Sequence, residues 1–293
     1  MDNLILKGCG TALITPFKNE EVDYKAFENL VKFQVEAGIH FLVPLGTTGE
    51  TPCLMDNERI KILQIAKEHA AGRPVMVGVG TNSLVMTRGN IDTLAPYDPD
   101  AFLVVTPYYN KPSQDGLYSY FTAVADYAPK PVVLYNVPGR TGVNISAETT
   151  LRLAEHPNII AVKEASGNYD QISKIIAHAP KGFAVLCGND DETLSLMATG
   201  AAGVISVASN IVPRDLVAMT EAMLRGDLAT ARPIHHRLFD LFKNCFVESN
   251  PIPAKAALYL MGMIQNELRL PLVPAQESTM VLMEKTLKDL NVI

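Results

Sequence analysis

Apolar segments of strand length recur through the first two-thirds of this 293-residue chain. Eight of them stand out, at 11–17, 41–46, 75–80, 101–107, 132–138, 159–164, 183–188 and 203–208. Each is a continuous apolar run rather than an alternation of apolar and polar residues, which is typical of parallel strands that are covered on both faces. The pattern therefore predicts eight buried parallel strands.

Amphipathic segments of helix length separate these runs. The segment 23–37, for example, places Phe27, Leu30 and Val31 on one face and is followed by Gly38 as a stop signal. Strand and helix therefore alternate, which favours a closed (β/α)8 barrel of the α/β class, a TIM barrel, over an open doubly wound sheet. The GxGxxG fingerprint of dinucleotide-binding sheets is absent after the first strand.

Residues 210–293 continue with helical periodicity and show no further strand pattern. This part is longer than the single helix that closes a barrel, and no Gly/Ser-rich or Pro-rich linker precedes it. We therefore expect one structural unit, in which 1–209 form the barrel core. The last barrel helix and a C-terminal helical appendage would occupy 210–293.

Composition narrows the classes of function. The chain is 48% hydrophobic and 19% charged, carries a formal charge of −6 and has no basic stripe, so nucleic acid is not an expected partner. Its four cysteines form no CxxC pair and no signal-peptide pattern opens the chain, which favours a reducing cytoplasm. Polar residues interrupt the longest uncharged stretch, 193–213, so we expect a helix end and a buried strand there, not a membrane span.

A lysine stands inside the sixth apolar run, 159–164. In a barrel the active site lies at the carboxyl ends of the strands, where Lys163 would sit. Burial disfavours the charged amine unless it is paired, and a neutral amine is a nucleophile for a carbonyl carbon. Glu164 is not an expected partner, because adjacent strand residues point to opposite faces. On position alone, a lysine that reaches solvent or pairs with an acid is an equal alternative.

Three other strand ends carry polar clusters, at 46–50 (GTTGE), 106–110 (TPYYN) and 135–142 (YNVPGRTG). Glycine turns and threonine hydroxyls offer donors for a carboxylate, a phenol can shuttle protons, and Arg140 could clamp a carboxylate with two hydrogen bonds. Each cluster alone has a plainer interpretation as a turn, as packing tyrosines or as a surface arginine.

Together, six segments resemble the pyruvate-dependent class I lyases, the family of N-acetylneuraminate lyase and dihydrodipicolinate synthase, with the closer match to the synthases. They are GTTGE, TPYYNKPSQDGLY, YNVPGRTG, VKEASGN, CGND and GVISVASN, in this order, within a resemblance that runs from about Gly8 to the C-terminus. The resemblance implies that Lys163 binds pyruvate as a Schiff base. The pyruvate would then condense with L-aspartate 4-semialdehyde to give 4-hydroxy-tetrahydrodipicolinate, toward diaminopimelate and lysine. No metal or other cofactor would be required.

The same resemblance implies the catalytic residues. Lys163 carries the pyruvate, Tyr135 acts as the proton-shuttling phenol, and Thr47 links it to Tyr109. In this family that last tyrosine reaches in from a neighbouring subunit. The resemblance thus implies a homodimer as the minimum, and a dimer of dimers, a homotetramer, as the usual assembly.

Substrate-binding residues are also implied. Thr48 resembles the holder of the pyruvate carboxylate, and Gly188 and Ile205 match positions whose backbone lines the pocket. Arg140 resembles the clamp for the semialdehyde carboxylate, an arginine that the sialic acid and keto-deoxy sugar acid lyases of the family lack at this position. A carboxylate on the second substrate follows.

Three alternatives remain open from the sequence. The first is a related lyase that cleaves a keto-deoxy sugar acid or sialic acid. The second is a metal-dependent aldolase, which would need a cluster of histidines and carboxylates that six scattered histidines do not provide. The third is a barrel that binds a keto acid without catalysis.

Two positions differ from the pattern of relatives that lysine inhibits, and one further lysine resembles part of a family motif. Relatives inhibited by lysine carry histidines in the stretch that corresponds to 51–59 and an acid four positions beyond the match to Asn82, where this chain has Met86. We therefore expect that lysine does not inhibit. Lys255, within NPIPAK, also resembles a family motif, but a lysine at a helix start outside the barrel rim is interpreted as structural or as an interface residue.

Overall fold

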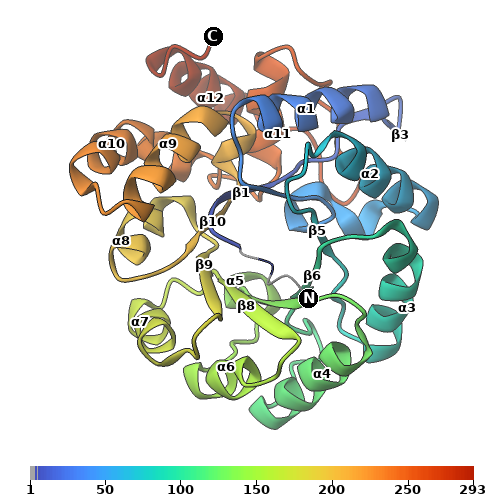
Figure 1. Ribbon diagram of the computed structural model, residues 1–293. Coiled ribbons are helices and arrows are strands. Elements are labelled where there is room, and N and C mark those ends of the chain that lie inside the picture. The colour runs from blue at the N-terminus through green and yellow to red at the C-terminus, as the bar shows by residue number, and fades with distance from the viewer. Residues whose placement is uncertain (1–3, 5) are drawn as a thin grey trace.

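The computed structural model describes residue 4 and residues 6–293, in which a parallel sheet curls into a barrel (Figure 1). The strands hydrogen-bond in the order β4-β1-β10-β9-β8-β7-β6-β5, and a bridge between Leu42 and Val75 joins the two ends of that order. The predicted (β/α)8 barrel is confirmed. Its strands are β1 (Gly8–Ala12), β4 (Phe41–Val43), β5 (Met76–Gly78), β6 (Ala101–Val105), β7 (Val132–Asn136), β8 (Ile159–Glu164), β9 (Ala184–Cys187) and β10 (Gly203–Ser206).

The first strand is the one whose predicted bounds are wrong. It begins at Gly8, three residues before the predicted run 11–17. Its start is glycine-rich because Gly10 faces the ring of Phe41, where an added Cβ would lie 2.0 Å from a ring carbon. After it comes a small hairpin of β2 (Phe17–Lys18) and β3 (Glu21–Val22), too short for its periodicity to be recognised.

A helix follows each barrel strand and packs on the outside of the sheet (Figure 1). In the first, the Asp23 side chain accepts a hydrogen bond from the Ala26 N–H at 2.9 Å and so caps the helix. These helices are α1 (Tyr24–Glu36), α2 (Asp56–His69), α3 (Leu84–Leu94), α4 (Gln114–Tyr127), α6 (Ala147–Ala154), α7 (Tyr169–His178), α8 (Thr193–Ala198) and α9 (Pro213–Leu224).

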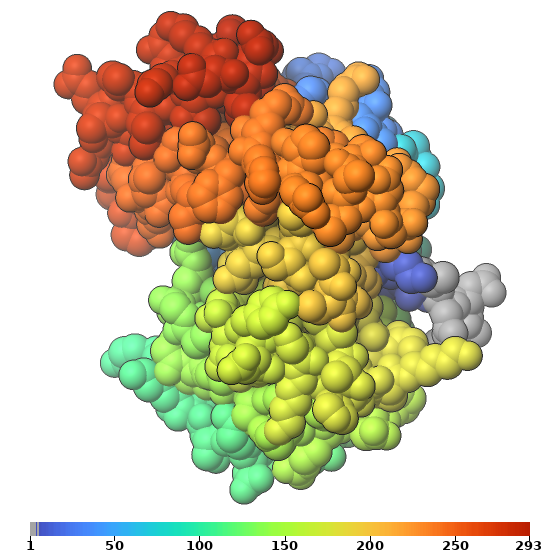
Figure 2. Space-filling view, turned by 90° about the vertical axis from the view of Figure 1, so that its left-hand side faces the viewer, coloured from blue at the N-terminus to red at the C-terminus, as the bar shows by residue number. Residues whose placement is uncertain are grey.

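The C-terminal part adds three helices, α10 (Leu228–Asn244), α11 (Ile252–Leu260) and α12 (Glu277–Asp289). Helix α10 packs against α9 and α12, and α11 packs against α12. Figure 2 shows these orange and red residues gathered at one end of the molecule. None of the helices in the described part of the chain has the length and apolar character to cross a membrane.

Two apolar layers surround the sheet. The inner one fills the barrel with side chains such as Phe41, Met76, Leu103 and Ile205, and the outer one packs the helices onto the strands. The barrel is therefore a filled core and not a pore, which leaves the strand ends as the place for a site. Short turns follow the carboxyl ends of the strands there: η1 (Thr47–Gly49), η2 (Thr51–Cys53), α5 (Pro138–Thr141), η4 (Asp190–Glu192) and η5 (Ala208–Asn210).

Candidate active site

Lys163 and Tyr135 face each other across adjacent strands. They are register partners in the β7–β8 pair, at the carboxyl end of both strands. The Lys163 Nζ atom lies 4.3 Å from the centre of the Tyr135 ring, and the lysine is 6% exposed. A cation at this distance from an aromatic face is stabilised by the ring, yet the amine remains close to the phenol. The two residues that the sequence separates by 28 positions therefore form one group.

Gly188, the residue after β9, leaves the room that Lys163 occupies. A Cβ atom added there would lie 3.2 Å from the Lys163 Cε atom and 2.6 Å from the Ala165 Cβ atom. The Gly188 N–H donates to the Glu164 carbonyl at 2.7 Å, which holds the glycine against the end of β8. Ile205 is fully buried in the inner layer on β10, on the same side of the sheet as Tyr135.

Glu164 points away from Lys163, as the alternation along a strand predicts. Its carboxylate accepts hydrogen bonds from Asn136 Nδ2 at 3.0 Å, the Ser166 N–H at 2.9 Å and Gln171 Nε2 at 3.1 Å. Burial raises the pKa of this carboxyl group, and its hydrogen bonds oppose that rise. The network fixes the end of β8 and so the backbone from which Lys163 projects.

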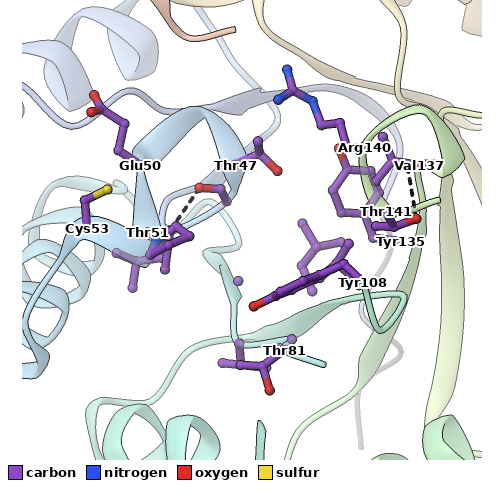
Figure 3. A pocket seen from close by; sticks show the side chains of 18 of the residues that line it. Thr47, Glu50, Thr51, Cys53, Thr81, Tyr108, Tyr135, Val137, Arg140 and Thr141 are labelled. Carbon is purple, nitrogen blue, oxygen red and sulfur yellow. Dashed lines mark hydrogen bonds between the residues drawn. The ribbon is translucent and has the colours of Figure 1, made fainter. Parts of the chain in front are cut away.

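A cavity of about 390 Å³ lies beside these strand ends. In Figure 3 the turn with Thr47 and Thr51 faces Tyr135 and Arg140 across it. Lys163 does not line the cavity and lies against the ring of Tyr135, which does. Other lining residues are Gly46, Glu50, Pro52, Cys53, Arg59, Thr81, Asn90, Tyr108, Thr141 and Asn250.

The turn after β4 presents the two threonines differently. Thr47 lines the cavity, whereas Thr48 is buried and its Oγ1 accepts a hydrogen bond from Asn250 Nδ2 at 2.9 Å. Since a hydroxyl has one donor and two acceptor positions, the Thr48 proton stays available for an acceptor such as a carboxylate. The Arg140 Nη2 atom donates to the Asn250 carbonyl at 3.3 Å. Asn250 thus connects Thr48 with Arg140.

Tyr109 is not brought to the cavity within one chain. It is 90% exposed and has a φ of 71°, in the left-handed region that a tyrosine rarely adopts. Its neighbour Tyr108 lines the cavity instead, which the sequence analysis did not single out. Residues other than glycine in such a conformation often lie at functional sites, but within this chain Tyr109 does not line the cavity.

The sequence analysis also missed a buried ion pair beside the cavity. Lys255 is fully buried within the chain, with its Nζ 2.5 Å from Glu50 Oε1, so the interpretation as an interface residue is wrong. Burial lowers the pKa of Lys255 to about 8, against the opposing effect of Glu50. A lysine inside the apolar segment 252–260 is the same signal that identified Lys163, so the sequence could have indicated that Lys255 is buried, although not that Glu50 is its partner.

Among residues 4 and 6–293, no group of three or more histidine, cysteine, aspartate or glutamate side chains is arranged to hold a metal ion. Comparison with known proteins shows which family the chain is similar to. The profile of the dihydrodipicolinate synthetase family matches residues 5–290.

Individual relatives match over nearly their full length. A 4-hydroxy-tetrahydrodipicolinate synthase of Phocaeicola vulgatus is 50% identical over 293 residues, which cover 98% of each chain. The crystal structure of dihydrodipicolinate synthase from Thermotoga maritima is similar with a TM-score of 0.96 at 45% identity, covering 98% of this chain and 99% of that one. A structure described as the first monomeric dihydrodipicolinate synthase variant has a TM-score of 0.96 at 44% identity, covering 98% of this chain and 97% of that one.

Proposed function

The chain belongs to the dihydrodipicolinate synthetase family, and on that premise we propose how its site performs the family reaction. It is a lyase that condenses pyruvate with L-aspartate 4-semialdehyde to 4-hydroxy-tetrahydrodipicolinate, a step toward diaminopimelate and lysine. The sugar acid lyase, metal-dependent aldolase and non-catalytic alternatives are set aside, because relatives of up to 50% identity carry the synthase name over the whole chain.

One observation carries the assignment of the chemistry. Lys163 and Tyr135 are register partners at the carboxyl end of the barrel, with the amine 4.3 Å from the ring. The amine attacks the ketone carbon of pyruvate, water leaves, and a protonated imine forms. The imine draws electrons from the methyl carbon, which loses a proton and becomes an enamine. That carbon then adds to the aldehyde carbon of the second substrate, whose oxygen takes up a proton and remains as the hydroxyl group. The amino group of the second substrate attacks the lysine imine carbon, which closes the ring and releases the Lys163 amine.

Proton transfer in this scheme belongs to Tyr135, Thr47 and Tyr109. The phenol of Tyr135 lies beside the amine, and Thr47 lines the same cavity, so both can reach a bound keto acid. Tyr109, exposed and outside this cavity, completes the relay in a second copy of the chain. The proposed active form is therefore a homodimer, and a dimer of dimers is its proposed larger assembly.

Binding of the two carboxylates falls to different elements. Thr48 offers its remaining hydroxyl proton to the pyruvate carboxylate. Gly188, which packs against the Lys163 side chain, and Ile205, which is buried in the inner layer, are proposed to bound the inner end of the site, and neither lines the cavity beside Tyr135. Arg140 lies across the cavity from Thr47 and receives the semialdehyde carboxylate (Figure 3).

The proposed chemistry uses the lysine imine and no metal or other cofactor.

All four cysteines, which lie in the described residues, are free thiols, and this supports the proposed location in a reducing cytoplasm. We also propose a single unit of barrel core, 1–209, and C-terminal helical part, 210–293.

The first test is the intact mass of the protein after borohydride treatment with and without pyruvate. Reduction converts the imine into a stable amine, so the wild type should gain the mass of one reduced pyruvate adduct per chain. Lys163→Ala should gain nothing, while Lys174→Ala, which removes an exposed lysine, should behave as the wild type does. A wild type that gains no mass would refute the lysine chemistry.

A further inference from the structure

The Lys255–Glu50 pair is one of the most deeply buried charged contacts in the described chain. Both side chains are fully buried, and the Lys255 Nζ atom also donates to the Glu267 carbonyl at 2.9 Å and lies 4.1 Å from the centre of the Phe17 ring. The second Glu50 oxygen accepts the Arg269 N–H at 3.1 Å. Desolvating two charges to this degree is costly, so the pair contributes less to stability than its distance suggests. The position of the pair, next to the turn that carries Thr47 and Thr48, explains its presence better than stability does.

Glu50 is the hinge between two turns that carry the site. It ends η1, which contains Thr47 and Thr48, and precedes η2, and its φ of 52° lies in the left-handed region. Its N–H donates to the Thr47 carbonyl at 3.1 Å. A residue forced into this conformation needs neighbours that hold it there, and the Lys255 ammonium is the closest of them.

A second contact from the same segment holds the same turn. Asn250, five residues before Lys255, donates to Thr48 Oγ1 at 2.9 Å. The segment at the start of α11 therefore contacts the turn at two points, Thr48 and Glu50, and both Glu50 and Asn250 line the cavity together with Thr47. The Lys255 ammonium itself does not line the cavity, so its effect would reach the chemistry through the turn that carries the threonines.

We infer that Lys255 and Glu50 form a positioning pair, in which the buried ammonium fixes the turn that presents Thr47 and Thr48 to the pyruvate. The inference rests on the proposed function of those threonines and extends it to Lys255, a buried lysine that does not line the cavity, and to the carboxylate that it contacts. Loss of the pair should displace the turn and weaken both pyruvate binding and proton transfer. The Lys163 imine should still form when pyruvate is saturating, because β7 and β8 are held by other contacts.

Three variants separate positioning from general stabilisation. Lys255→Met removes the ammonium and leaves a buried carboxylate. The double variant Glu50→Gln with Lys255→Met removes both charges, which buried pairs often tolerate without loss of stability. Glu58→Gln is the matched control, because it removes the charge and one of the two hydrogen bonds, of 2.6 and 2.7 Å, between Glu58 and Arg269 in the same cluster but does not touch the turn.

The measurements are kcat and KM for pyruvate, the thermal midpoint and the borohydride mass adduct. Lys255→Met and the double variant should lower kcat/KM for pyruvate on the order of 100-fold, the loss expected from a small misplacement of catalytic groups. Both should still form the adduct at saturating pyruvate. Glu58→Gln should lower the midpoint and keep kcat/KM near the wild-type value.

Either of two results would overturn the inference: a folded double variant with wild-type kcat/KM, or a loss of kcat/KM as large in Glu58→Gln as in the double variant. If Lys255→Met fails to fold, the double variant decides. A wild type without a pyruvate adduct would instead overturn the proposed function and this inference with it.

Discussion

At the scale of single residues, two buried lysines differ in one neighbour. Both amines lie over an aromatic ring, Tyr135 for Lys163 and Phe17 for Lys255, but only the Lys255 amine forms an ion pair, 2.5 Å from a carboxylate. A carboxylate partner stabilises the ammonium and ties up its protons, but an aromatic face leaves room for the amine to attack a carbonyl. The sequence does not show this difference in neighbours, which distinguishes a candidate nucleophile from a structural cation.

Tyr135→Phe tests the proposed proton shuttle. The ring and its contact with Lys163 are retained, while the hydroxyl is lost, so kcat should fall roughly 100- to 10,000-fold. The borohydride adduct with pyruvate should still form, though more slowly. Tyr108→Phe, which removes another phenol from the same cavity, should leave kcat near the wild-type value. Equal losses in both variants would argue against a specific role for Tyr135.

Arg140→Gln tests the carboxylate clamp. The amide keeps a hydrogen-bond donor but loses the charge, so KM for aspartate semialdehyde should rise roughly 10- to 100-fold, the range for one charged hydrogen bond. KM for pyruvate should stay unchanged, because Arg140 contacts the backbone carbonyl of Asn250, whereas the Asn250 side chain contacts Thr48. A parallel rise of both KM values in steady-state assays would contradict separate carboxylate sites.

Lysine addition tests the expected absence of feedback inhibition. Arg59 lies in the stretch where inhibited relatives carry histidines, lines the cavity and donates to the Thr51 carbonyl at 3.2 Å. Its guanidinium would repel the ammonium of a second cation there. Millimolar lysine should therefore leave the pyruvate saturation curve unchanged, and a severalfold shift of that curve would contradict this prediction.

At the scale of elements, the sequence predicts strands and helices well where one residue pattern decides them. Seven strands lie within their predicted apolar runs, because buried parallel strands need apolar side chains on both faces. The glycine-rich start of β1 was not predicted, because Gly10 has no apolar side chain and the Phe41 ring fills the space in its place. The cluster of Lys163, Tyr135 and Arg140 could be predicted from strand ends, but the Glu50–Lys255 contact could not, because no local pattern encodes it.

His40, just before β4, offers a test of how β1 is held. Its Nδ1 accepts the Cys9 N–H at 3.1 Å, and burial lowers its pKa from the ordinary 6.5, against the opposing effect of Glu221. As the pH falls below about 6.5, His40 is protonated in the unfolded chain but not yet in the folded protein. The free energy of unfolding that His40 contributes above this pH is therefore lost as the pH falls. In urea unfolding between pH 5 and pH 7, His40→Asn, which keeps an acceptor, should show a shallower pH dependence than the wild type. An unchanged slope would exclude His40 as its source.

At the scale of the whole molecule, the proposed site is complete only when two chains meet. Tyr109 is 90% exposed and outside its own chain's cavity, while Lys163 is buried beside that cavity. A subunit that lacks one of these residues can therefore still supply the other to a partner. The assembly itself, and not only the barrel, would determine activity.

Mixing two inactive variants tests this arrangement. Lys163→Ala supplies an intact Tyr109, and Tyr109→Phe supplies an intact Lys163, so a mixed dimer holds one complete site. After dissociation and random reassortment at equal amounts, about a quarter of the sites should be complete, and activity should recover to that level. Two Lys163→Ala preparations mixed in the same way should stay inactive. No recovery in confirmed mixed dimers would place Tyr109 outside the reaction.

Glu50 and Lys255 are 205 residues apart in the sequence, so the ribosome adds them to the chain at different times. At about 5 to 20 residues per second, a ribosome releases Lys255 roughly 10 to 40 s after Glu50. A nascent chain that has already formed its barrel strands still lacks the ammonium and the Asn250 amide that fix the threonine turn. The enzyme would therefore acquire its full activity only late in synthesis, after the segment that carries Asn250 and Lys255 has been made.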